Sequence, residues 1–451
     1  MSSLKKQIGE SVFYNSLGNI VIQVFAIIGY FLIIRELSVH DYGVFVLLVS
    51  FIGPVAAVAF LSLDQIFVSK FAQAKGRGDT SFLKGLFREY YLVGNGIIAV
   101  LIVAGYFFQD AISRAHDIYL AQYFWYLTAF ILSQLSMNQV SLFLGANEKF
   151  KAVAIIETVE SVLRTAVVIG VVLLGSFSVK GAMLMYASAK LASTLVGLWY
   201  SWPLMRALVL SPAKAQPRVL WSLLSSFGKW EAGKNLLEQA VSPVKFTLIK
   251  VFVSVEGVAI YDFARNVYAF ASKIVPISKV IFPVVSRFSE DREKLNLIIS
   301  KAKKYTFLAY TMIFVGALVL TPLVLAYIFP QYAGSELVVY FTLLHFLCDT
   351  YKVGQTALLY AFNKQKFLFQ VTPLFMLSQL ILDFFLTRAF GIFGAVLSWH
   401  VHAFFTGAVF NWYFHSVVRI ARTRWSDFFC FDAYDRIFLE SFTRTLKALW
   451  R

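Results

Sequence analysis

Long apolar stretches alternate with short charged segments along almost the whole chain. Each stretch holds about twenty residues, which is enough for a helix to cross the roughly 30 Å hydrocarbon core of a bilayer. The series continues far beyond the first stretch, so a lone secretory signal does not explain it. The pattern predicts twelve membrane-spanning helices, near 11–34, 42–64, 88–108, 119–143, 152–174, 181–202, 228–251, 257–285, 304–329, 337–361, 367–390 and 394–416.

Composition agrees with an all-α polytopic membrane protein. Hydrophobic residues make up 59% of the 451 residues, and charged residues only 15%. A soluble domain carries about 25% charged residues, which keep its surface in water. The two cysteines, Cys348 in an apolar run and Cys430 in the tail, lie in settings too different for a disulfide, and they fit no metal or redox motif.

The charge of +16 follows the predicted topology. Of the 41 Lys and Arg residues, 27 lie in the amino end and in the loops and tail on the same side of the spans. The opposite loops hold only four, namely Arg35, Arg114, Lys180 and Arg388. An excess of Lys and Arg marks the cytoplasmic side, so both termini are expected in the cytoplasm. The basic balance therefore does not indicate nucleic-acid binding.

The segments outside the spans are short, except for the tail. The longest outward loop, 109–118, is too small to carry a catalytic domain. In the cytoplasmic tail, 417–451, apolar residues recur at helical spacing over 431–450 with charged residues between them. This pattern favours an amphipathic helix on the cytoplasmic leaflet. The alternative is a loosely ordered tail.

A weak internal repeat occurs at an offset near 216. Matched positions include Asn19 and Asn235, Gln23 and Gln239, and Ser38-Val39 and Ser254-Val255. Six spans per half is an even number, so both halves enter the membrane in the same direction. We expect two six-helix lobes, 1–202 and 221–416, joined by a cytoplasmic connector, 203–220. Parallel repeats of this kind place a substrate path near the bilayer midplane.

Charged residues inside the predicted spans gather in spans seven and eight, which carry seven cations against three carboxylates. Intramembrane charges are costly and usually face a cavity or a partner. On span eight, Asp262, Arg265 and Lys273 share one face with Asn266. We therefore expect a hydrated, cationic cavity that binds an anionic head group such as a pyrophosphate. Its candidate binding residues are Lys234, Asn235, Lys245, Arg265, Lys273 and Lys279.

Internal pairing is the alternative for these charges. Lys234–Glu238 and Asp262–Arg265 have helical pair spacing and would then neutralise each other. In span five, Glu160 and Arg164 have the same spacing, which predicts a structural ion pair. Three carboxylates are candidates for binding a coupling ion, namely Asp64, Glu238 and Asp262.

Three other signals are rejected. The segment 228–235 resembles a phosphate-binding loop, but Asn235 replaces the hydroxyl that ligates Mg²⁺ and no strand precedes it. His400 and His402 would face opposite sides of a helix, and His345 has no histidine near it in the sequence. No catalytic residue, metal, cofactor, nucleotide or nucleic acid is expected.

Two groups of motifs resemble the polysaccharide flippases of the multidrug/oligosaccharidyl-lipid/polysaccharide (MOP) exporter superfamily. They are Tyr42-Gly43-Val44-Phe45 with Ser62-Leu63-Asp64-Gln65, and Ile260-Tyr261 with Ala264-Arg265. The resemblance implies two six-helix bundles in a V around a central cavity. It also implies alternating access, with Asp64, Lys234, Lys245, Arg265 and Lys273 on the path.

The cargo implied by the resemblance is a polyprenyl-(pyro)phosphate-linked oligosaccharide, carried across a bacterial cytoplasmic membrane. Membrane lipids and other membrane proteins of polysaccharide assembly are the candidate partners. Peptidoglycan-precursor flippases of the superfamily carry two further helices, so O-antigen or exopolysaccharide units fit this chain better. The alternatives are a drug or cation antiporter of the same superfamily and an integral-membrane glycan polymerase or ligase. The antiporter would favour an acidic cavity, and the polymerase a large outward loop.

Overall fold

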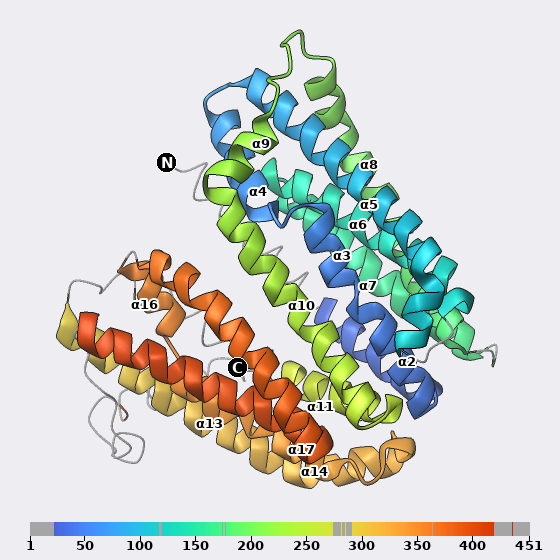
Figure 1. The fold of residues 1–451 in the computed structure, drawn as a ribbon, viewed down its shortest axis with the longest axis vertical. Coiled ribbons are helices and arrows are strands. Elements are labelled where there is room, and N and C mark those ends of the chain that lie inside the picture. The colour runs from blue at the N-terminus through green and yellow to red at the C-terminus, as the bar shows by residue number, and fades with distance from the viewer. Residues whose placement is uncertain are drawn as a thin grey trace, which may run out of the picture. The chain divides into compact units, whose positions relative to one another are not determined.

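The computed structural model describes residues 22–116, 120–173, 175, 177–273, 281, 285, 291–362, 364–418 and 435. Every regular element among these residues is a helix, which confirms the predicted all-α class (Figure 1). Except for residues 417, 418 and 435, the predicted tail and its amphipathic helix lie outside the described residues.

The helices follow one another closely along the chain. Residues 22–36 are helical. The elements of the first part are α2 (Val39–Ser50), α3 (Ile52–Ala59), α4 (Asp64–Gly76), α5 (Thr80–His116), η1 (Leu120–Gln122), α6 (Phe124–Ala146), α7 (Phe150–Leu173) and α8 (Val179–Val209). They are followed by α9 (Val219–Leu223), η2 (Leu224–Gly228), α10 (Lys229–Phe252), α11 (Val255–Lys273), α13 (Arg292–Tyr327), η3 (Pro330–Tyr332), α14 (Glu336–Leu343), α15 (His345–Lys352), α16 (Gln355–Ala361), α17 (Gln365–Tyr413) and η4 (Phe414–Val418).

Six of the described helical segments are long and apolar enough to cross a membrane. These segments are Val39–Ala59, Thr80–Arg114, Phe124–Ala146, Val179–Val209, Arg292–Tyr327 and Lys366–Ser416. The last one contains two of the predicted spans, because α17 is broken at Gly391, where φ is +59° and ψ is −136°. The helix α8 continues through Pro203, so the predicted connector begins inside a helix. The total of twelve spans stays a prediction.

The weak sequence repeat includes a helix-capping device. Ser38 caps α2 by accepting a hydrogen bond from the Asp41 N–H, and Ser254 accepts from the Gly257 N–H at the start of α11. Such a cap contributes about 1 kcal/mol to a helix. His40 and Glu256, each two positions after its cap, lie 216 residues apart in the sequence and form a contact of 2.8 Å.

The close approach of α2 and α11 explains the glycine in the Tyr42-Gly43-Val44-Phe45 motif. A Cβ atom on Gly43 would overlap the carbonyl oxygen of Val255. Only a residue without a side chain therefore allows the two helices to approach this closely, as small residues do at helix contacts within membranes.

The chain divides into two compact units. Unit 1 comprises Met1–Asn266, Thr321–Val339 and Phe369–Ser398, and unit 2 comprises Val267–Leu320, Tyr340–Leu368 and Trp399–Arg451. These units combine segments that are distant in sequence, and the lobes predicted from the repeat stay a prediction.

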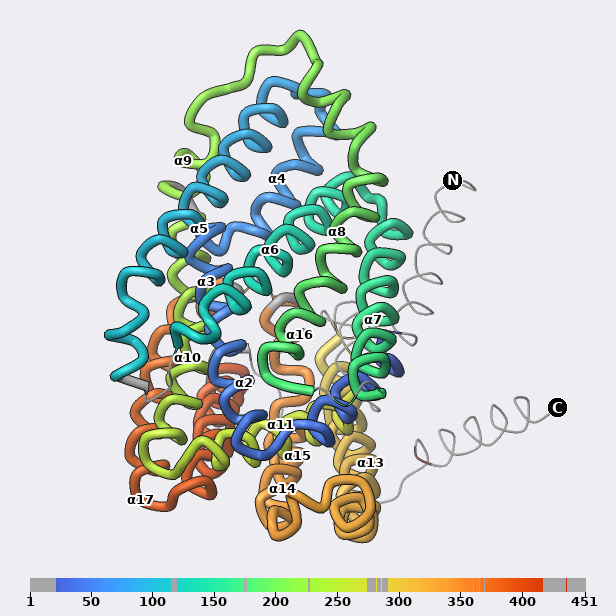
Figure 2. The backbone as a smooth tube through the Cα atoms, turned by 90° about the vertical axis from the view of Figure 1, so that its right-hand side faces the viewer, coloured from blue at the N-terminus to red at the C-terminus, as the bar shows by residue number. Residues whose placement is uncertain are grey.

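Each unit contains its own packed core. In unit 1, α5, α6, α7 and α8 lie side by side (Figure 2), and one core cluster there comprises Met137, Val140, Leu144, Ala152 and Ile156. In unit 2, a cluster includes Leu295, Ile299, Leu358 and Phe414. Because lipid is as apolar as a leucine side chain, close packing rather than transfer from water holds such helices together within a bilayer.

Candidate functional site

Unit 1 contains a cavity of about 190 Å³. Its walls come from residues 22–36 and from α2, α8, α10 and α11. Both halves of the sequence therefore contribute to it. The lining residues are Tyr30, Ile33, Tyr42, Phe45, Val46, Val49, Ser50, Tyr186, Phe246, Asp262, Arg265 and Asn266.

The carboxylate of Asp262 is held on one side of this cavity by three donors. The Tyr42 hydroxyl donates to it over 2.6 Å, and a guanidinium N–H of Arg265 over 2.8 Å. The side-chain amide of Asn266 donates over 2.8 Å as well. Asp262 is buried, and charge-assisted hydrogen bonds of these lengths compensate the loss of water around it. The predicted Asp262–Arg265 pair is thus present as part of a larger network.

Arg265 lines the cavity with a side chain that stays partly accessible. Its side chain is 37% exposed, while that of Asp262 is 6% exposed. The guanidinium also lies over the ring of Phe246, with the central carbon 5.0 Å from the ring centroid. A guanidinium has five N–H donors in a fixed plane, so one bond to Asp262 leaves donors that an anion in the cavity can accept from.

Lys245, a second predicted binding residue, occupies an enclosed position. Its ammonium lies 2.9 Å from Asp383 and 3.5 Å from the carbonyl oxygen of Ala395. Asp383 also accepts hydrogen bonds from Gln379 and Ser398. The side chains of Lys245 and Asp383 are 8% and 0% exposed. The charge of Lys245 is therefore compensated within the protein.

Two further binding candidates lie near the amino end of α10. Lys234 forms an ion pair with Glu231 at 3.2 Å, and the side-chain amide of Asn235 donates to both Glu231 and the Ser62 carbonyl oxygen. Ser62 has a positive φ of 50° in the turn between α3 and α4. Asn235 thus contacts the turn near the end of the predicted second span, 42–64.

The remaining candidates are dispersed. Lys273 is exposed at the end of α11, with its ammonium 5.4 Å from the Phe270 ring centroid. Glu238 is exposed on α10, and Asp64 accepts a hydrogen bond from the Tyr90 hydroxyl. Lys279 lies outside the described residues. Among the predicted set, only Asp262 and Arg265 line the cavity described above.

One ionic cluster near the cavity contains a residue that the sequence analysis missed. The predicted Glu160–Arg164 pair is present at 3.5 Å, and Lys190 on α8 also contacts Glu160, at 3.2 Å. Arg164 lies over the ring of the cavity residue Tyr186, 5.1 Å from its centroid. This cluster carries two formal positive charges against one negative. A lone lysine inside the apolar span 181–202 was the available signal.

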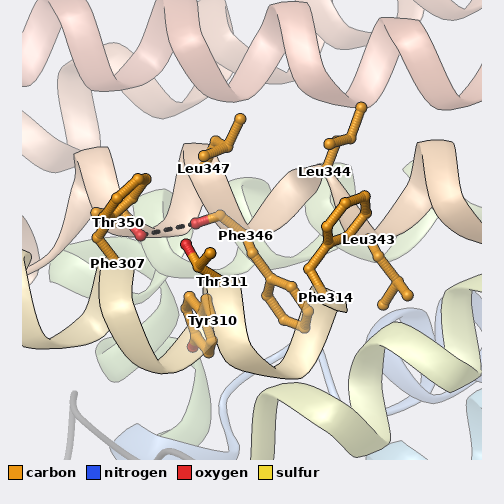
Figure 3. Close-up of a pocket in the computed structure, with 9 residues that line it drawn as sticks. All are labelled: Phe307, Tyr310, Thr311, Phe314, Leu343, Leu344, Phe346, Leu347 and Thr350. Atoms are coloured by element: carbon orange, nitrogen blue, oxygen red, sulfur yellow. Dashed lines mark hydrogen bonds between the residues drawn. The ribbon is translucent and has the colours of Figure 1, made fainter. Parts of the chain in front are cut away.

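A second cavity, in unit 2, differs in its chemistry. It has a volume of about 70 Å³ and is lined mainly by apolar side chains from α13, α14 and α15 (Figure 3). The hydroxyl of Thr350 already donates to the Phe346 carbonyl oxygen. Because no charged residue lines this cavity, the larger cavity with Arg265 is the better candidate for an anion.

Known structures share the fold of this chain. An inward-facing multidrug resistance MATE family transporter of the MOP superfamily is similar at a TM-score of 0.70 and 14% identity, over 89% of this chain and 97% of the other. The lipid II flippase MurJ in an inward closed conformation is similar at a TM-score of 0.70 and 14% identity, over 93% of this chain and 89% of the other. The Vibrio cholerae MATE transporter VcmN is similar at a TM-score of 0.61 and 16% identity, over 95% of this chain and 99% of the other.

Sequence comparison identifies the family. No curated protein shows significant sequence similarity to the chain. Residues 8–289 match the model of the family described as polysaccharide biosynthesis protein, and this match covers more than half of the chain. With the fold of MOP superfamily transporters, the chain belongs to the polysaccharide biosynthesis protein family.

Proposed function

We propose that this protein is a flippase that moves a polyprenyl-(pyro)phosphate-linked oligosaccharide from the cytoplasmic to the outer leaflet by alternating access. The family and the shared fold support a transporter of this superfamily. The observation that carries the substrate class is Arg265, whose side chain is partly exposed, lines a cavity and is held by a buried carboxylate.

The ionic environment of the cavity favours an anion. Arg265 is the cation among the described residues that line this cavity, and its guanidinium has more donors than its bond to Asp262 uses. A pyrophosphate accepts hydrogen bonds from a guanidinium in a bidentate manner. Lys234, Asn235, Lys245, Lys273 and Lys279 stay proposed binding residues, and Asp64, Glu238 and Asp262 stay proposed ion-coupling residues.

The cellular setting is part of the same proposal. We place the protein in a bacterial cytoplasmic membrane with both termini in the cytoplasm, where polyprenyl-linked saccharides meet it on the leaflet on which the basic loops lie. Repeat units of O-antigen or exopolysaccharide are the proposed cargo. Membrane proteins that polymerise or attach these units are the proposed partners.

The test is the position of the lipid-linked glycan in cells that lack the protein. We expect the precursor to accumulate on the cytoplasmic leaflet and surface polysaccharide to be lost. Wild type should restore both, and the Arg265→Gln/Lys273→Gln double variant should restore neither while reaching the membrane in normal amount.

The matched control is Lys229→Gln, which removes a cation that is exposed beside Trp230. This variant should complement fully. Normal surface glycan together with altered drug tolerance would replace the proposal by the antiporter. A precursor that reaches the outer leaflet but is not polymerised would replace it by the polymerase or ligase.

A further inference from the structure

Three side chains with metal-binding atoms meet inside unit 2. His345 and Cys348 lie one turn apart on α15, and His400 lies on the part of α17 that follows Gly391. All three are buried, with exposed fractions of 1%, 1% and 7%. Their ligand atoms all lie within 4.8 Å of one another. His345 has no histidine near it in the sequence, but α17 brings His400, 55 positions later, into contact with it.

The two imidazole rings face each other through the same nitrogen. The Nδ1 atoms of His345 and His400 lie 3.0 Å apart. The Nε2 atom of His400 lies 2.9 Å from the carbonyl oxygen of Phe341, which can only accept a hydrogen bond, so this nitrogen carries the hydrogen. Nδ1 of His400 then presents its lone pair to His345.

The outer nitrogen of His345 also faces an acceptor. Its Nε2 atom lies 3.9 Å from a carboxylate oxygen of Asp349, which is too far for a hydrogen bond but places a negative charge beside the ring. The lone pair on Nδ1 of His400 can therefore accept a hydrogen from Nδ1 of His345 or bind a metal ion that replaces this hydrogen. The sulfur of Cys348 beside the two nitrogens is a third ligand atom for such an ion.

The surrounding side chains hold the rings in place. His345 stacks on Trp399, with the centroids 3.8 Å apart and the planes 18° apart. The ring of Tyr268 meets His345 edge-on, and its hydroxyl donates to Asp349. Carboxylates and carbonyls that accept from the outer nitrogen of a ligating histidine are typical of protein metal sites.

The separation of the two nitrogens is close to what a small transition-metal ion requires. With metal–nitrogen bonds of about 2.05 Å, two nitrogens 3.0 Å apart subtend about 94° at the metal. A separation larger by about 0.3 Å gives the tetrahedral angle of about 109°. We propose that His345, Cys348 and His400 form a binding site for one ion of the Zn²⁺ class, with a fourth position for water.

The protons and formal charges balance when such an ion binds. The divalent ion replaces the proton on the Cys348 sulfur, the proton leaves to solvent, and the two imidazoles bind in their neutral form. The thiolate offsets one of the two positive charges, and the Asp349 carboxylate lies near enough to offset the other. The ion would join α15 to a segment of α17 that is distant in sequence and would thereby stabilise unit 2.

The experiment uses the full-length protein in detergent, purified through a tag without histidine. After treatment with a chelator, the protein is loaded with Zn²⁺, desalted and analysed by mass spectrometry of the metal. We expect one Zn²⁺ per chain. Each of His345→Gln, Cys348→Ser and His400→Gln should reduce this content at least tenfold, and the control His402→Gln should leave it unchanged.

Two further measurements keep the test independent of variant folding. The wild type loaded with Co²⁺ should show a thiolate-to-cobalt absorption band, which Cys348→Ser removes while its gel-filtration profile is retained. Asp349→Asn should keep one site and weaken Zn²⁺ affinity about 10–100-fold, as outer-shell changes do. Wild-type protein that retains no more Zn²⁺ than His345→Gln, or shows no cobalt band, would overturn the proposal and leave a proton shared between the imidazoles.

Discussion

Two ion pairs in unit 1 contain cations that the sequence analysis treated alike. Lys245 on α10 pairs with Asp383 at 2.9 Å, and Arg265 on α11 pairs with Asp262 at 2.8 Å. In the first pair both side chains are at most 8% exposed. In the second, the Asp262 side chain is 6% exposed but the Arg265 side chain is 37% exposed.

The helix that supplies the carboxylate differs between the two pairs, and this explains the difference in exposure. Asp383 lies on α17, a separate helix that carries its carboxylate onto the Lys245 ammonium, where the Ala395 carbonyl oxygen completes the enclosure. Asp262 lies three residues before Arg265 on the same helix, so this ion pair brings no second helix against the guanidinium. The Arg265 side chain is therefore more accessible than that of Lys245.

The enclosed pair should show the largest effect on stability. Lys245→Met removes the cation and leaves the fully buried Asp383 carboxylate without its charge partner. Breaking a buried pair in this way costs about 3–5 kcal/mol of unfolding free energy. Thermal unfolding of the purified protein in detergent measures this loss. The Lys245→Met/Asp383→Asn double variant should regain most of it, and a single variant as stable as wild type would contradict the assignment.

The cluster of Glu160, Arg164 and Lys190 sharpens the comparison, because one buried carboxylate there pairs with two cations that are largely shielded from solvent. Glu160→Gln keeps the side-chain shape and removes the charge. We expect a loss of about 1.5–3 kcal/mol, the range for hydrogen bonds to charged groups. Glu157→Gln, on the same helix, is the control and should cost less in the same unfolding assay. Equal losses would mean that Glu160 does not hold the two cations.

Tyr42 tests the network behind Arg265. Tyr42→Phe removes the hydroxyl that donates to Asp262, while Arg265 and Asn266 continue to donate to it. The expected loss of stability is about 1.5 kcal/mol, at the lower end for a bond to a charged group. A double-mutant cycle with Asp262→Asn measures the coupling of the two residues. Additive losses would show that the hydroxyl does not support this carboxylate.

The smallest effect is expected at the exposed contact between His40 and Glu256. The hydrogen bond from His40 lowers the pKa of Glu256 in the folded protein. The contact therefore stabilises the fold above the unfolded-state pKa of Glu256 and loses this contribution as the pH falls through the lower folded-state pKa. Both side chains are about half exposed, so His40→Ala should lower the unfolding free energy by about 0.2–1 kcal/mol at neutral pH. A stability difference from wild type that grows below pH 4 would be inconsistent with this sign.

The sequence predicted the elements well because their causes are local. Apolar stretches long enough to span a bilayer indicated the helices. The capping roles of Ser38 and Ser254, which the sequence analysis noted only as repeat positions, became clear from the structure. The Asp262–Arg265 and Glu160–Arg164 pairs were also predictable, since helical spacing alone brings them together. Nothing in these patterns depends on how distant segments pack.

The contacts between distant segments could not be predicted in this way. Asp383 lies 138 positions after Lys245, and Asp262 lies 220 positions after Tyr42. Pairing across such separations depends on which helices become neighbours and on their rotation, and one sequence fixes neither. For the same reason, the sequence could not predict the contact between His345 and His400, which lie on two different helices of unit 2.

The most direct test of the central claim is the affinity of the purified protein for a short prenyl pyrophosphate, compared with a prenyl alcohol of the same length. If the guanidinium of Arg265 binds the anionic head group, Arg265→Gln should weaken pyrophosphate binding about 10–150-fold, which corresponds to about 1.5–3 kcal/mol. Binding of the alcohol should not change. Equal pyrophosphate affinities of wild type and Arg265→Gln would contradict the account and remove Arg265 from the binding site.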